Sequence, residues 1–273
     1  MTTRALLASP LGVLIGVVVG ALGGGGSILV VPVLVFIVGQ SVVDATSTSL
    51  VVVGVASVVG AYGHWRSGRV RLAIGLVFGV VGIPGSVAGS LLNRGVDDDV
   101  LLLAFAGLIL VAAWRIAVGC PSCTRGGEAA ALAVPEGESS LRTVVRTLSP
   151  ARLAKLAVAG TVVGFLSGLF GVGGGFLIVP ALALVLGFPM RQAVGTSLLI
   201  IVINTGAAFV ARLGTGTIDW GTTLLFTAAA TAGVGLGKRV ADRVDAETMQ
   251  RGFAALLVLV ALYTGARALF ALY

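Results

Sequence analysis

Charged side chains are scarce in this sequence. Only 11% of its 273 residues are Asp, Glu, Lys or Arg, whereas 57% are hydrophobic, and the mean hydropathy is +1.09. A water-soluble protein of this length needs many more charged residues to cover its surface. The composition therefore excludes a soluble domain and predicts an integral membrane protein.

Groups that carry out chemistry are also rare. The chain has one histidine, two cysteines and no acidic residue near the middle of an apolar run. An intramembrane enzyme needs clustered catalytic groups, so we do not expect an enzyme. A GxxxxGK[ST] motif is missing, which argues against an ATPase. We expect no cofactor and no metal, because Cys120 and Cys123 form a single CxxC and supply only half of a tetrahedral zinc site.

Apolar runs fill most of the chain. Those of about 20 residues are long enough to cross the hydrocarbon core as helices. The runs occupy 10–38, 42–62, 72–92, 100–118, 153–187, 190–211, 220–237 and 252–272. The net charge of +7 lies mainly in the connections, as expected for cytoplasmic loops, and does not imply nucleic-acid binding. We expect an all-α, multi-pass protein of the inner (plasma) membrane.

The sequence repeats itself at a spacing of 148 residues. Ten glycines of the first half coincide with glycines of the second, where roughly three coincidences would arise by chance. Thr48-Ser49 coincides with Thr196-Ser197, and Pro32 with Pro180. We interpret residues 1–118 and 151–273 as two membrane repeats joined by a cytoplasmic linker, residues 119–150.

Two kinds of glycine pattern occur at the start of each repeat. Glycines at every fourth position form small-residue faces for close helix packing, namely Gly12, Gly16 and Gly20, and Gly160, Gly164 and Gly168. The dense clusters at 23–26 and 171–175 should instead break the helix, leaving two half-helices at 11–22 and 27–38 in the first repeat. Main chain freed from a helix at membrane depth must line a cavity or a ligand. Its amide groups would suit an anion.

Two topologies fit this pattern. If each first segment crosses the membrane as one broken helix, the repeats have four spans each and share one orientation, with about 12 of the 18 Lys and Arg residues inside. If each first segment is re-entrant, three full spans follow it and the repeats are inverted, with about 14 of the 18 inside. The positive-inside rule favours the inverted form. Inverted repeats are also a common basis for alternating access.

These motifs resemble the sulfite exporter (TauE/SafE) family of small permeases. The duplicated element reads GVVVGALGGGGSILVVPVL with DATSTSL in the first copy and GFLSGLFGVGGGFLIVPAL with QAVGTSL in the second. The resemblance covers nearly the whole chain. It implies transport of sulfur-containing anions, such as sulfite and small organosulfonates, or of related organic anions.

The expected substrate site combines both glycine clusters with nearby polar side chains. Its residues are Gly23, Gly24, Gly25, Gly26, Ser27, Thr48, Ser49, Gly171, Gly173, Gly174, Gly175, Thr196, Ser197 and Asn204. Candidates for ion coupling or gating are Asp44, His64, Arg191, Arg212 and Asp219, with H⁺ or Na⁺ as the coupling ion. For His64, an ordinary solvated loop position is the commoner alternative. We expect a secondary carrier that forms a homodimer, and an anion channel without ion coupling is the alternative.

Overall fold

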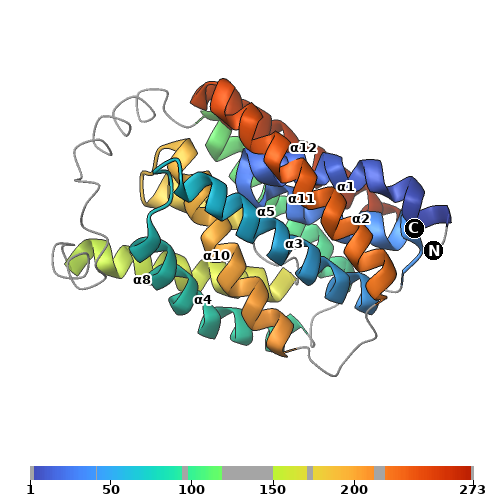
Figure 1. The fold of residues 1–273 in the computed structure, drawn as a ribbon. Coiled ribbons are helices and arrows are strands. Elements are labelled where there is room, and N and C mark those ends of the chain that lie inside the picture. The colour runs from blue at the N-terminus through green and yellow to red at the C-terminus, as the bar shows by residue number, and fades with distance from the viewer. Residues whose placement is uncertain are drawn as a thin grey trace.

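The computed structural model describes residues 3–40, 42–93, 98–118, 150–170, 175–211 and 219–271. The structure is helical, with no β-strand among these residues, which confirms the expected all-α class (Figure 1). The linker expected at 119–150 lies outside the described residues except for Pro150, as do both cysteines.

The described elements of the two halves follow a similar order. The first half comprises α1 (Thr3–Leu22), the 3₁₀ turn η1 (Gly23–Gly26), α2 (Ser27–Val33), the π-helix η2 (Leu34–Val38), α3 (Val42–Trp65), α4 (Leu72–Asn93) and α5 (Asp98–Val118). The second comprises α8 (Pro150–Phe170), α9 (Gly175–Pro180), the π-helix η3 (Ala181–Val185), α10 (Met190–Ala211), α11 (Trp220–Arg243) and α12 (Ala246–Ala271). Each half thus has a long helix, a short one and three more long helices.

Three described helices are long and apolar enough to cross a membrane. They are Ser47–Trp65 in α3, Leu72–Gly89 in α4 and Met190–Val210 in α10. Shorter apolar stretches lie in α1, α5 and α8, at Pro10–Leu22, Ala104–Ile116 and Leu156–Leu169. The structure therefore agrees with a membrane protein and assigns the clearest spans to α3, α4 and α10.

The halves interlock through their long helices. α1 packs along α11, α4 along α8, α5 against α12 and α3 against α10, so each of these pairs joins one half to the other. The core lies between them, and its largest fully buried side chains include Phe78, Phe226, Phe253, Leu198 and Ile200. Neither half buries its apolar faces alone.

The spaced glycines make two of these contacts possible. A Cβ atom at Gly16 or Gly20 would overlap the backbone of Ala230 or Val234 in α11. At the equivalent positions in α8, a Cβ at Gly164 would overlap Gly82 of α4. Small residues allow helix backbones to approach this closely. The packing role expected for these glycines is confirmed.

The same contacts give the directions of the helices. Gly12 lies near Phe226 and Gly20 near Val234, so α1 and α11 run parallel. α3 and α10 run antiparallel, because Gly60 faces Leu198 whereas Gly54, one and a half turns earlier, faces Thr205. α2 and η2 contact α1, so the segment after the glycine cluster does not simply continue the line of α1.

Candidate functional site

The first glycine cluster interrupts the helix where the sequence predicts. α1 ends at Leu22 and α2 begins at Ser27. Gly23 has φ +74°, a left-handed conformation that side chains with a Cβ rarely adopt. The glycines were expected to unwind the chain here. They form a tight 3₁₀ turn, Gly23–Gly26, instead. The change of direction is concentrated at Gly23.

This turn meets the second half of the chain. A Cβ at Gly24 would overlap the carbonyl group of Gly175, the first residue of α9. A Cβ at Gly23 would lie 2.7 Å from the hydroxyl oxygen of Ser197 and 3.1 Å from Val179 Cγ2. The first cluster thus touches both the end of the second cluster and the second Thr-Ser element. Gly171, Gly173 and Gly174 lie outside the described residues.

The structure brings some, but not all, of the predicted hydroxyl groups to this contact. Ser197 is fully buried, and its hydroxyl donates to the backbone oxygen of Val194 at 2.8 Å. Thr196, also buried, accepts a hydrogen bond from the backbone N–H of Arg71 at 3.1 Å, which ties α10 to the start of α4. Asn204 is half-buried and lies two turns, roughly 10 Å, beyond Ser197 along α10.

The first Thr-Ser element contacts a different helix. Thr48 and Ser49 are buried in α3. Thr48 faces α11, where the hydroxyl of Thr223 lies 3.5 Å from its own. The described contacts therefore assemble Gly23, Gly24, Gly175 and Ser197 as one group, with Thr48 outside it.

Asp219 and Arg191, two of the predicted charged residues, bond to backbone groups. Asp219 caps the N-terminus of α11, where Oδ1 accepts from the backbone N–H groups of Gly221 at 3.0 Å and Thr222 at 3.4 Å. Arg191, in the first turn of α10, donates to the backbone oxygen of Val244 at 3.0 Å. Asp44 is half-buried in the first turn of α3, and Arg212 lies outside the described residues.

His64 is not the solvated loop residue that is the commoner case. It lies in the last turn of α3 with 1% of its surface exposed, and its Nε2 is 3.2 Å from the backbone oxygen of Gly20 in α1. The sequence does not reveal this burial, because a polar turn begins two residues after His64, at Arg66. Packing between α1, α3 and α11 encloses the ring.

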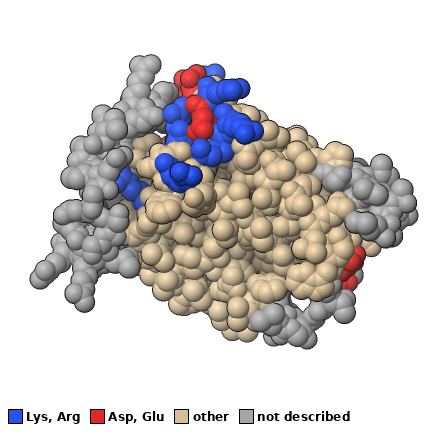
Figure 2. Space-filling view, in the orientation of Figure 1, with Lys and Arg blue, Asp and Glu red and all other residues tan. Residues whose placement is uncertain are grey.

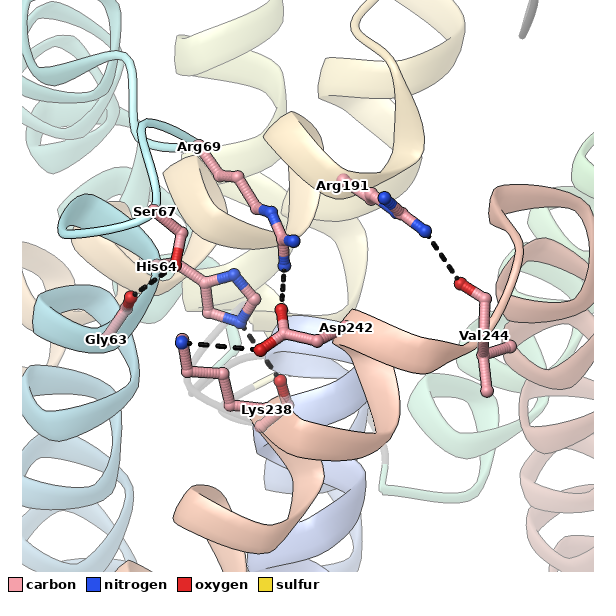
Figure 3. A network of polar contacts seen from close by, with 9 residues as sticks. Gly63, His64, Ser67, Arg69, Arg191, Lys238, Asp242 and Val244 are labelled. Carbon is pink, nitrogen blue, oxygen red and sulfur yellow. Dashed lines mark hydrogen bonds and ion pairs between the residues drawn. The ribbon is translucent and has the colours of Figure 1, made fainter.

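A charged cluster that the sequence did not predict lies beside His64 (Figure 3). We define it as Arg69, Lys238 and Asp242. Arg69 Nη1 donates to Asp242 Oδ1 at 2.5 Å, and Lys238 Nζ donates to Asp242 Oδ2 at 3.4 Å. The spacing of Lys238 and Asp242 on α11 was visible in the sequence, but the bond between residues 69 and 242 depends on the tertiary fold.

Charges of both signs hold this cluster together. Partial burial raises the pKa of the Asp242 carboxyl, but the hydrogen bond and charge of Arg69, with the charge of Lys238, outweigh burial and hold that pKa below its ordinary value. On the face that Figure 2 shows, most Lys and Arg side chains gather in one area, together with acidic side chains. Among the described residues, no group of three or more His, Cys, Asp or Glu side chains could hold a metal ion.

Comparison with known proteins places the chain in a family. Its sequence matches the family described as "Sulfite exporter TauE/SafE" over residues 8–264. A "Probable membrane transporter protein" of Xylella fastidiosa is 32% identical, covering 92% of this chain and 91% of the relative. YdhB of Bacillus subtilis is 27% identical over 76% of this chain and 78% of its own length, and MJ0441 of Methanocaldococcus jannaschii is 28% identical over 78% and 75%.

Both of these relatives also have "Probable membrane transporter protein" in their names. No solved structure matches the chain significantly. The family match spans almost the whole sequence, both glycine clusters included. The chain therefore belongs to the sulfite exporter TauE/SafE family and is a membrane transporter.

Proposed function

We propose that the protein is a secondary carrier of small sulfur-containing or related organic anions, such as sulfite or organosulfonates, in the inner membrane. The observation that carries this proposal is the contact of the first glycine cluster with Gly175 and Ser197 of the other half. A carrier needs a site between two parts that can move relative to each other. Family membership supports an anion as the substrate.

The proposed site uses main-chain groups more than charged side chains. Glycine has no side chain to cover its backbone N–H group, and such groups bind anions when several point at one place. Ser197 adds a hydroxyl at the same contact. That hydroxyl donates to Val194 in the present structure, so it would rotate to donate to a bound anion.

Helix directions support an inverted arrangement of the two halves. α1 runs parallel to α11, and α8 runs parallel to α4, since Gly160 lies near Phe78 and Gly168 near Ser86. The equivalent helices α3 and α10 run antiparallel. If the two halves are inverted repeats, each first segment turns back at its glycine cluster, and a rocking motion of one half against the other exposes the site to either side.

The charge distribution supports the orientation of this arrangement. The ends of α3 and α11 and the starts of α4 and α10 carry a group of basic residues: Arg66, Arg69, Arg71, Arg191, Lys238, Arg239 and Arg243. The positive-inside rule assigns this end of the bundle to the cytoplasm. The glycine contact lies near this end, because a Cβ at Gly195, two residues before Ser197, would meet the backbone oxygen of Arg69 at 2.7 Å.

Flux measurements in proteoliposomes test the proposal. We expect purified protein to move sulfite or a small sulfonate, and an imposed H⁺ or Na⁺ gradient to drive accumulation above the external concentration. A channel would equilibrate the anion without accumulating it. Gly24→Val should abolish flux, because its side chain would collide with Gly175. Gly235→Val is the matched control, since a Cβ at Gly235 meets no atom within 4 Å.

A second variant tests the site even if Gly24→Val does not fold. Ser197→Ala removes one hydroxyl and adds no volume, and we expect the KM for the anion to rise roughly tenfold or more, as for the loss of one hydrogen bond to a charged group. Normal flux and KM in both variants would refute the proposed site. Failure to transport any of sulfite, taurine, sulfoacetate or thiosulfate would refute the proposed substrate class.

A further inference from the structure

The ring of His64 is bonded on one side only. A carbonyl oxygen can only accept, so Nε2 carries the proton that it donates to Gly20. The other ring nitrogen, Nδ1, is buried and has no hydrogen-bond partner. In the neutral ring this nitrogen is a lone-pair acceptor, and leaving it unpaired costs less than burying an unpaired charge.

The surroundings of the ring are poorly suited to a positive charge on it. Arg69 from the α3–α4 connection and Lys238 from α11 face it with positive charge, and Asp242 from α11 is the single negative group. Asp242 is already bonded to both cations. α1 contributes the backbone of Gly20, and α10 contributes Gly195, whose added Cβ would lie 3.2 Å from His64 Cβ.

Arg191, the described cation in the first turn of α10, does not face the ring. Its guanidinium points away from the ring toward Val244 (Figure 3). A proton taken from water onto Nδ1 would therefore place a buried N–H donor without an acceptor next to two cations. Protonation must favour any conformation in which the ring leaves this position.

Leaving this position has a direct consequence for the glycine site. The bond from His64 holds Gly20, which lies three residues before the left-handed Gly23. It joins the end of α3 to the last turn of α1 at the point where α1 changes direction. Breaking it removes the hydrogen bond that ties this turn to α3.

We propose that His64 is a proton-operated latch for the first glycine cluster. Neutral His64 holds the last turn of α1 in place through Gly20, and protonation at Nδ1 releases it. The inference rests on the proposed carrier function and deepens it, because it names the proton as the ion that acts on the site and His64 as the positioning residue through which it acts.

The single histidine of the chain permits a direct test. Protein labelled with [¹⁵N]histidine, purified with a tag that contains no histidine, gives the signals of one imidazole ring. In lipid nanodiscs near neutral pH, we expect a neutral ring protonated at Nε2. As the pH falls, the Nδ1 signal should move to the protonated position. A ring protonated at Nδ1 alone, or one that stays neutral across the whole range in which the protein is folded, would overturn the proposal.

Hydrogen–deuterium exchange then tests the release. We expect amides of residues 17–26 in the wild type to exchange roughly threefold to tenfold faster after acidification, corrected for the intrinsic exchange rate, as for the loss of one hydrogen bond. His64→Gln keeps an N–H donor for Gly20 but cannot titrate, so its exchange should not respond to pH. His64→Ala should exchange fast at every pH.

These measurements need no substrate and so remain separate from the flux assay. An equal response to pH in wild type and His64→Gln would refute the latch and leave the carrier proposal intact. A pH response confined to the wild type, together with absent anion flux, would support the latch and refute the carrier. Poor folding of either variant would leave the wild-type titration as a decisive measurement.

Discussion

At the scale of single residues, Asp219 shows how a candidate for ion coupling can have a local explanation. Its backbone is extended, with φ −73° and ψ 92°, and its carboxylate satisfies two amides at the start of α11. The hydroxyl of Thr222 donates to Oδ2 at 2.6 Å, and this bond, ahead of the backbone bonds, lowers the pKa of Asp219. The residue has the features of an N-cap.

Replacing Asp219 tests this capping role. We expect Asp219→Ala to lower the free energy of unfolding by about 1 kcal/mol and Asp219→Asn to lower it less, because asparagine also caps helices. Since the pKa of Asp219 is lowered by folding, its stabilisation is present above the ordinary pKa of aspartate and is lost as the pH falls through the folded value. Thermal unfolding of wild type and Asp219→Asn at stepwise lower pH measures this difference.

Measuring proton-coupled flux tests the alternative, in which Asp219 takes part in ion coupling. A capping residue should leave the dependence of flux on an imposed proton gradient intact in Asp219→Asn. Loss of that coupling, with an unchanged melting temperature, would return Asp219 to the candidates for ion coupling.

At the scale of elements, glycine contacts determine how closely the helices approach. Gly164 and Gly206 lie in the long helices α8 and α10, but a Cβ at Gly164 would overlap the backbone of Gly82, whereas a Cβ at Gly206 meets no atom within 4 Å. The same substitution should therefore have opposite effects at these two positions.

We expect Gly164→Ala to reduce the free energy of unfolding by about 1–3 kcal/mol, the usual cost of overpacking. Gly206→Ala should be neutral or stabilising by up to about 1 kcal/mol, because alanine favours a helix over glycine. Equilibrium unfolding in mixed micelles compares the two variants. Equal effects would mean that the close approach of α8 and α4 does not limit stability.

Much of the element order could be predicted from the sequence, because apolar runs and glycine punctuation are local signals. The interruption between Leu22 and Ser27 lies at the glycine cluster, as the sequence predicts. The approach of Ser197 to Gly23 could not be predicted, since it depends on how α10 crosses the first cluster. The burial of His64 was missed for the same reason: one histidine beside a polar turn carries no periodic pattern that would indicate a covered side.

At the scale of the whole molecule, the bundle depends on contacts between the two halves. The long helices pair across the halves, and the central glycine contact does the same. Polar bonds also join the two halves. Arg69 and Asp242 form one such bond, across 173 residues of sequence.

A double-mutant cycle with Arg69→Gln and Asp242→Asn measures what this bond contributes. The side chains are 19% and 36% exposed, so solvent screens the pair only in part, and we expect a coupling free energy of about 1 kcal/mol that falls as salt is added. Asp242→Asn alone should destabilise the protein more than Arg69→Gln alone, because it leaves both Arg69 and Lys238 without their counter-charge. Strictly additive effects, insensitive to salt, would show that apolar packing holds the halves together at this end and that the ion pair does not contribute to stability.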